Sequence, residues 1–134
     1  MAFDWIEYLN LATELSTHPD EASQRTAVSR AYYFAYNIAK DRAIANQYSQ
    51  PEDGSSHDNL WALYNRNSSS DGCKRLALLG GRMKRKRVIA DYRQHFSRIN
   101  EELAGVLEDA RECHVIMKTL EHKYPEALPR SWSF

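Results

Sequence analysis

Residues 99–120 read INEELAGVLEDARECHVIMKTL, and this stretch decides the fold class. Its apolar residues recur at steps of 4, 3, 4, 3, 4 and 3, and they are Ile99, Leu103, Val106, Ala110, Cys113, Met117 and Leu120. Steps of three and four place side chains on one face of an α-helix. The stretch therefore predicts a long amphipathic helix that packs against other helices along this seam.

The chain upstream of this seam has the same helical character. Helices are expected over 4–15, from Pro19 towards Tyr48, around Leu60 to Tyr64, and over 73–90, with polar loops between them. Val, Ile and Thr, which favour strands, number only 14 of 134 residues. The sequence predicts an all-α fold, in which the pair Gly80-Gly81 marks either a break or a close contact between helices.

Length and composition describe one ordinary globular domain, residues 1–134. Hydrophobic residues make up 43% and charged residues 27% of the chain, which excludes wholesale disorder. No apolar run is long enough to cross a membrane, and the start of the chain lacks the pattern of a signal peptide, so a cytoplasmic location without membrane partners is expected. Cys73 and Cys113 have no metal-type spacing, and they are interpreted as two reduced thiols. No metal and no cofactor are expected.

The charge is unevenly distributed, although its sum is zero. Residues 74–98 hold nine bases and one acid, Asp91, a net charge of +8 that the rest of the chain balances. The run Lys84-Arg85-Lys86-Arg87 has no acid near it in the sequence. It is either a solvated helix end or a binding site for an anionic partner such as RNA.

Two candidate residues lie outside that run. Arg30 falls in the apolar stretch of the second expected helix, where it either pairs with a core carboxylate such as Asp91 or contributes to RNA binding. His57 stands near an expected helix start, which favours a capping or packing role over catalysis.

Two segments resemble a known family. Ser29-Arg30-Ala31-Tyr32-Tyr33-Phe34-Ala35-Tyr36 resembles the Arg-Ala-Tyr-Tyr-x-Ala-aromatic signature of HEPN domains, and Arg85-Lys86-Arg87-Val88-Ile89-Ala90-Asp91-Tyr92 resembles their second motif. The resemblance implies a compact antiparallel bundle of four or five helices, usually a homodimer, here expected through the second and fourth helices. It also implies a role in toxin-antitoxin, CRISPR-associated or other defence systems.

Active members of that family are metal-independent endoribonucleases that use an Arg-x4-6-His motif from each protomer. Arg85 matches the motif arginine, but Ala90 stands five residues on, and a methyl group cannot transfer a proton. The nearest pair of the required types is Arg87 with His95, separated by seven residues. The resemblance also places Tyr92 where family members carry a tyrosine that a partner nucleotidyltransferase modifies with AMP.

The sequence therefore supports three hypotheses. The first is an RNA-associated HEPN-domain protein of a toxin-antitoxin or defence system, catalytically weak or inactive, with Lys84, Arg85, Lys86, Arg87 and Arg30 binding RNA. The second is an active metal-independent ribonuclease that uses Arg85 or Arg87 with His95. The third is a non-enzymatic helical adaptor that regulates a partner of the nucleotidyltransferase type.

Overall fold

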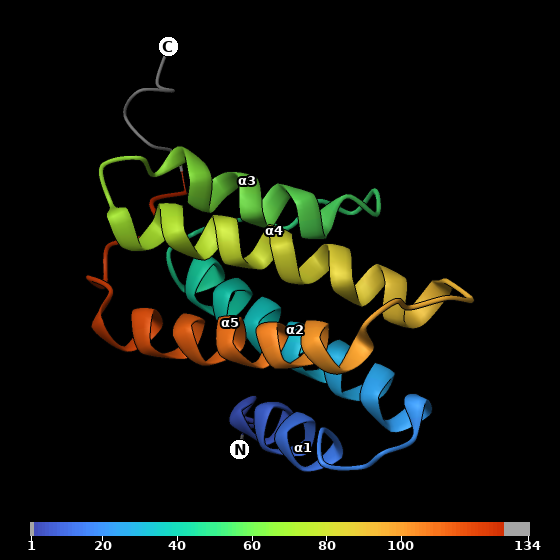
Figure 1. Ribbon diagram of the computed structural model, residues 1–134. Coiled ribbons are helices and arrows are strands. Elements are labelled where there is room, and N and C mark those ends of the chain that lie inside the picture. The colour runs from blue at the N-terminus through green and yellow to red at the C-terminus, as the bar shows by residue number, and fades with distance from the viewer. Residues whose placement is uncertain (1, 128–134) are drawn as a thin grey trace.

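The computed structural model describes residues 2–127, and in this part of the chain it contains five α-helices and no strand (Figure 1). The helices are α1 (Ile6–Leu15), α2 (Glu21–Ala45), α3 (Ser56–Arg66), α4 (Asp71–Tyr92) and α5 (Ile99–Thr119). The prediction of an all-α bundle is confirmed. None of these helices combines the length and the apolar character needed to span a membrane. Docking of Trp132 and Phe134, which the tail composition suggests, lies outside the described residues.

Side-chain caps explain where α2 and α4 begin, and a change in backbone conformation explains where α2 ends. The Asp20 carboxylate accepts a hydrogen bond from the Ser23 amide and starts α2. The Ser70 hydroxyl does the same for Cys73 at the start of α4. Helix α2 ends before Tyr48, because Gln47 adopts a positive φ of 77° that an α-helix does not allow.

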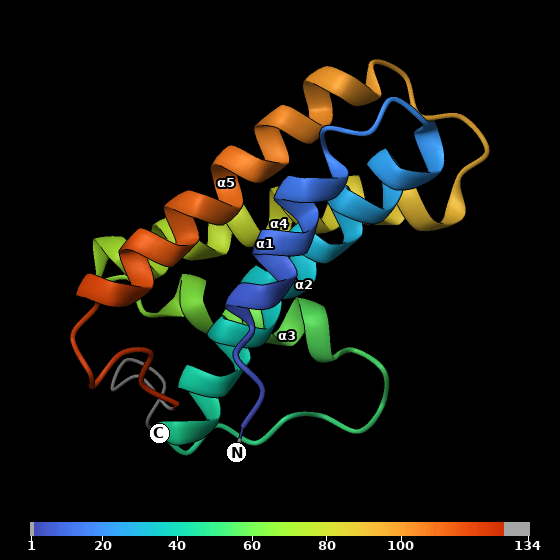
Figure 2. The same cartoon turned by 90° about the horizontal axis from the view of Figure 1, so that it is seen from below.

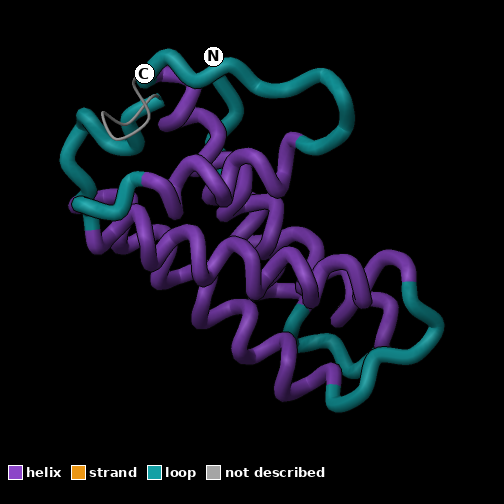
Figure 3. The backbone as a smooth tube through the Cα atoms, turned by 90° about the horizontal axis from the view of Figure 1, so that it is seen from above, coloured by secondary structure: helices purple, strands orange, loops and turns teal. Residues whose placement is uncertain are grey.

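Helix α2 lies at the centre of the bundle and contacts each of the other four helices. Figure 1 shows α3 and α4 above α2 and α1 below it, and Figure 2, seen from below, shows α1 in front of α2 with α5 alongside. The tube in Figure 3 shows the helices packed together and joined by loops. Its buried stripe consists largely of small side chains: Ala27, Ala31, Ala35, Ala39 and Ala43. Small residues let neighbouring helices approach closely, which is why a single helix can serve as the core of the bundle.

Two arginines of α2 bind the carboxyl ends of α4 and α5. The Arg25 guanidinium donates hydrogen bonds to the carbonyl oxygens of Ile89, Ala90, Arg93 and Gln94. The Arg42 guanidinium donates to those of Met117, Glu121 and Tyr124. These carbonyls lie in the last turn of a helix or just beyond it, and a cation at a helix carboxyl end is favourable. The arginines therefore fix both helix ends and the chain that follows each of them.

Helices α3 and α4 meet at a glycine. A Cβ added at Gly80 would lie 2.4 Å from the Trp61 ring, so only glycine allows the indole to pack on the α4 backbone. Helix α4 continues through Gly80-Gly81 without interruption. Of the two alternatives that the glycine pair left open, the close contact is therefore the one observed.

This contact yields a prediction with a built-in control. Gly80→Ala is expected to lower the free energy of unfolding, because overpacking a buried ring costs about 1–3 kcal/mol and alanine returns only about 1 kcal/mol of helix propensity. At Gly81 an added Cβ finds its nearest neighbour, the Arg85 guanidinium, at 3.8 Å. Gly81→Ala is therefore expected to stabilise the protein by about 1 kcal/mol. Urea denaturation of both variants measures the difference, and equal effects would contradict the proposed contact.

Candidate functional site

Most bases of α4 lie beside a carboxylate in the folded protein. Carboxylates of α3 and α5 reach four of these bases, and Asp91 of α4 itself lies beside the fifth. The ion pairs are Arg75–Glu112, Arg82–Asp109, Lys84–Asp58, Lys86–Glu102 and Arg87–Asp91. Three of the four members of the run Lys84 to Arg87 therefore have an acidic partner in the folded protein.

Arg85 and Arg93 are exceptions to this pairing. Both are exposed, and neither forms an ion pair among residues 2–127. They share a shallow cavity of about 270 Å³ that is lined by Lys84, Arg85, Val88, Ile89 and Arg93. Three bases and no acid thus border one depression, on a floor of two aliphatic side chains. Such an arrangement suits an anionic group.

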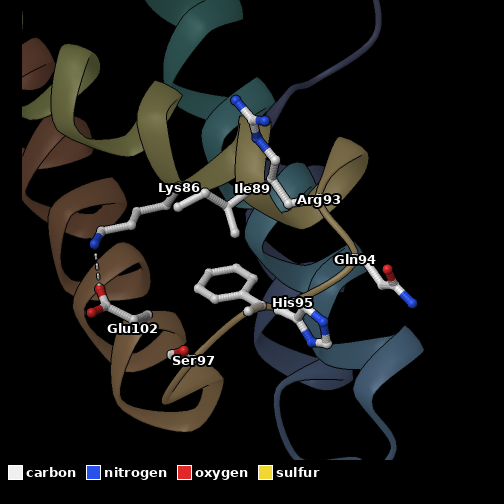
Figure 4. Close-up of a pocket in the computed structure, with 8 residues that line it drawn as sticks. Lys86, Ile89, Arg93, Gln94, His95, Ser97 and Glu102 are labelled. Carbon is white, nitrogen blue, oxygen red and sulfur yellow. Dashed lines mark ion pairs between the residues drawn. The ribbon is translucent and has the colours of Figure 1, made fainter.

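His95 lies in a different cavity, shown in Figure 4. This cavity measures about 470 Å³ and is lined by Lys86, Ile89, Arg93, Gln94, His95, Phe96, Ser97 and Glu102. Lys86 is paired with Glu102 across it, at 2.7 Å. Arg85 lines only the smaller cavity, and Arg87 lines neither. Arg85, Arg87 and His95 therefore do not share either of these two cavities.

Arg87 is buried among tyrosine rings. Its side chain is only 8% exposed, and its guanidinium carbon lies 5.5 Å from the ring centre of Tyr32, 5.4 Å from that of Tyr33 and 5.8 Å from that of Tyr92. The carboxylate of Asp91 is 3.8 Å away. The Nε atom has no hydrogen-bond partner among the described residues. The protein thus holds a cation mainly against π faces, which attract it electrostatically.

His57 belongs to the same cluster and is held by three aromatic neighbours. Its ring stacks on Tyr36 at 4.0 Å between ring centres. The Tyr32 hydroxyl lies 2.6 Å from His57 Nδ1 and also accepts a hydrogen bond from the Trp61 indole N–H. When the tyrosine O–H donates to Nδ1, the proton of a neutral His57 lies on Nε2. Packing, as the sequence favoured, is its structural role.

The surroundings favour the neutral form of His57 by lowering its pKa. Burial lowers the pKa of His57, and the positive charges of Arg87 and Lys84 lower it further. In a neutral imidazole whose Nδ1 accepts a hydrogen bond from tyrosine, the proton is on Nε2. Such a ring can donate a hydrogen bond to a ligand at Nε2 but cannot take a proton there.

Arg30 does not pair with Asp91. Its guanidinium carbon lies 4.8 Å from the ring centre of Tyr8 and 5.4 Å from that of Tyr33. The Asp91 carboxylate instead accepts a hydrogen bond from the Ser29 hydroxyl. The expected pairing is therefore wrong, because aromatic faces stabilise the Arg30 guanidinium where a core carboxylate was anticipated. The spacing of Tyr33 three residues after Arg30 was a signal for this contact.

The second-motif positions Ala90 and Tyr92 face opposite environments. Ala90 is 5% exposed and belongs to the core, so a histidine at this position would be directed into the interior of the protomer. Tyr92 is 73% exposed at the end of α4. The phenol of Tyr92 is therefore open to solvent, while the side chain of Ala90 is not.

Other catalytic chemistry finds little support in residues 2–127. No group of three or more metal-ligating side chains occurs in this range. Cys73 and Cys113 are free and buried, and burial raises the pKa of both thiols, which disfavours the nucleophilic thiolate. No protein-family model, curated protein or solved structure matches the chain.

The environment of His57 predicts a pH dependence of stability. Its pKa in the folded protein lies below the unfolded value of about 6.5, so below that pH the unfolded chain takes up a proton that the folded protein resists. Stability is therefore fully present above about pH 6.5 and falls as the pH drops towards the folded pKa. His57→Gln is expected to flatten this fall, as measured by thermal melting between about pH 7 and pH 5.

His114 provides the matched comparison. Burial lowers its pKa as well, so His114→Gln should remove a separate part of the same fall. An unchanged pH profile in the His57 variant would contradict the assignment of a neutral His57.

Proposed function

We propose that the protein is an RNA-associated HEPN-domain protein of a toxin-antitoxin or defence system, and that it binds RNA phosphates at the cavity of Arg85 and Arg93. One observation carries the proposal: this cavity is bordered by Lys84, Arg85 and Arg93 without a lining carboxylate, on a chain whose other α4 bases largely have acidic partners. The residue types suit the task, because a guanidinium presents a planar fork of donors to phosphate oxygens.

The bases of α4 differ in their ion pairs, so we expect them to contribute unequally to RNA binding. Lys86 and Arg87 each lie beside a carboxylate, so their charge is partly neutralised before any RNA arrives. Lys84 is held by Asp58, an exposed side chain that water screens. We therefore assign the main phosphate contacts to Arg85 and Arg93, with Lys84 in support.

Weak or absent cleavage is part of the proposal. Transfer of the 2′-hydroxyl proton needs a positioned acid or base, which typically contributes about 10² to 10⁴ in rate. Ala90 cannot supply it, His95 lines a cavity that Arg85 does not, and His57 is engaged by the Tyr32 hydroxyl at Nδ1 and stacked on Tyr36. The exposed phenol of Tyr92 is accessible to a nucleotidyltransferase partner, which is the observation that favours a paired system.

RNA binding by the double variant Arg85→Ala/Arg93→Ala tests the phosphate site. Affinity for RNA is expected to fall, since a hydrogen bond between charged groups contributes about 1.5 kcal/mol, or about tenfold, per contact. The salt dependence of binding should weaken by about 0.7 in logarithmic slope for each phosphate of a single strand that the variant no longer neutralises. Fluorescence anisotropy of labelled RNA over a range of salt concentrations measures both effects.

Lys74→Ala is the matched control, because Lys74 is an exposed base of the same helix outside the cavity. It should leave affinity nearly unchanged. Equal losses of RNA affinity in the control and the double variant would mean that binding depends on overall positive charge and not on this cavity. Absence of RNA binding by the parent protein at low salt would refute the proposed function. Efficient cleavage of the RNA in EDTA would refute the catalytically weak assignment.

A further inference from the structure

The proposed function leaves the cavity of His95 without a role. This cavity measures about 470 Å³, within the range of about 300–1,000 Å³ that is typical of sites for small molecules. Its apolar lining consists of Ile89 and Phe96, and polar side chains of the loop after α4 border it together with the ion pair of Lys86 and Glu102. An apolar lining with a few polar groups around it is typical of a site for a small amphipathic molecule.

Contacts within the protein hold the shape of this cavity. The Arg25 guanidinium donates hydrogen bonds to carbonyl oxygens at the end of α4 and in the loop that follows, and it lies 5.9 Å from the centre of the Phe96 ring. Phe96 is only 8% exposed and belongs to the core. On the side away from His95, Lys86 joins α4 to α5 through Glu102, at 2.7 Å (Figure 4). The cavity is therefore formed before a ligand arrives, which lowers the entropic cost of binding.

The polar side chains of the rim are free to bind a ligand. They are exposed, and within residues 2–127 they form no hydrogen bond or ion pair: Arg93, Gln94, His95 and Ser97. Each of them can donate a hydrogen bond, and the Arg93 guanidinium is always charged. Figure 4 shows this guanidinium directed away from Glu102, and rotation about the bonds of an exposed side chain can bring it to a ligand within nanoseconds. The rim therefore favours an anionic acceptor group.

Glu102 limits how much negative charge the ligand can carry. Its carboxylate lines the cavity and is paired with Lys86. A nucleoside triphosphate, which carries several negative charges, would be repelled by this carboxylate, whereas a single anionic group can lie away from it, beside His95. The cavity of Arg85 and Arg93 has no lining acid and does not discriminate in this way.

We propose that the cavity of His95 binds a small monocarboxylate with an aromatic or aliphatic body. The body packs against Ile89 and Phe96, and the carboxylate accepts hydrogen bonds from the Arg93 guanidinium and the His95 ring. The two parallel N–H groups of a guanidinium match the two oxygens of a carboxylate, which favours this head group. Binding at this cavity does not depend on the proposed function.

Benzoate is the probe, and the amide resonances of the full chain, observed by two-dimensional NMR at constant ionic strength, report its binding. For a ligand of this size a dissociation constant of about 1 mM is expected, with chemical-shift changes concentrated in residues 86–102. Benzamide keeps the ring but not the charge, and acetate keeps the charge but not the ring. Each should bind about tenfold more weakly than benzoate.

Two variants locate the site. Arg93→Gln removes the charged partner of the carboxylate and is expected to weaken benzoate binding about tenfold. Lys74→Gln is the matched control, because Lys74 is an exposed base of α4 that does not line this cavity, and it should leave the affinity unchanged. Both replaced side chains are exposed, so both variants should fold, which circular dichroism checks.

Four results would overturn the proposal. They are benzamide or acetate binding as tightly as benzoate, equal losses of affinity in Arg93→Gln and Lys74→Gln, shift changes that lie only outside residues 86–102, and the absence of any change at about 20 mM benzoate. The measurement contains no RNA, so failure of the proposed function would not alter its result.

Discussion

The contact of the Arg87 guanidinium with the rings of Tyr32 and Tyr33 is the interaction on which the packing of α2 against α4 depends. A buried cation is tolerated only where charge or polarisable surface compensates for lost water. The tyrosine rings that compensate for the lost water are held in place by other helices of the bundle. Trp61 holds the Tyr32 hydroxyl by a hydrogen bond, and it comes close enough to do so because Gly80 presents no side chain to the indole. The packing of α3 on α4 and the aromatic surroundings of Arg87 thus depend on one another.

The packing of the helices also determines which bases of α4 have acidic partners. Carboxylates of α3, α4 and α5 offset most of the positive charge of α4, so a strongly basic sequence segment becomes a surface on which two guanidinium groups, Arg85 and Arg93, stand without acidic partners. The α2 arginine Arg25 binds the carbonyls at the end of α4 and thereby holds the chain that carries Arg93 and His95. The cavity of Arg85 and Arg93 and the exposed ring of Tyr92 then lie near one another at the end of this helix.

Much of the fold, and less of the site, could be predicted from the sequence. Regular spacing identified the helices, because a single helix face decides which side chains are buried. The run Lys84 to Arg87 was uniform in charge, yet Arg87 follows the apolar row of Leu76, Met83 and Ala90 and enters the core, while Arg85 faces outward. Helical spacing alone could have predicted that Arg87 is buried and that Arg85 is exposed. The acids that neutralise Lys84 and Lys86, and the Tyr8 ring over Arg30, lie on other helices, and only tertiary packing brings them close.

The central claim is the proposal that RNA binds at the cavity of Arg85 and Arg93, at the carboxyl end of α4. Ultraviolet crosslinking of a bound uridine-containing RNA, followed by mass spectrometry of the crosslinked peptides, tests it most directly, because short-range crosslinks form only with side chains in contact with a base. The account predicts crosslinks in the peptide at the carboxyl end of α4 that are lost in Arg85→Ala/Arg93→Ala. Crosslinks confined to α5 or α3, with none at the carboxyl end of α4, would contradict it.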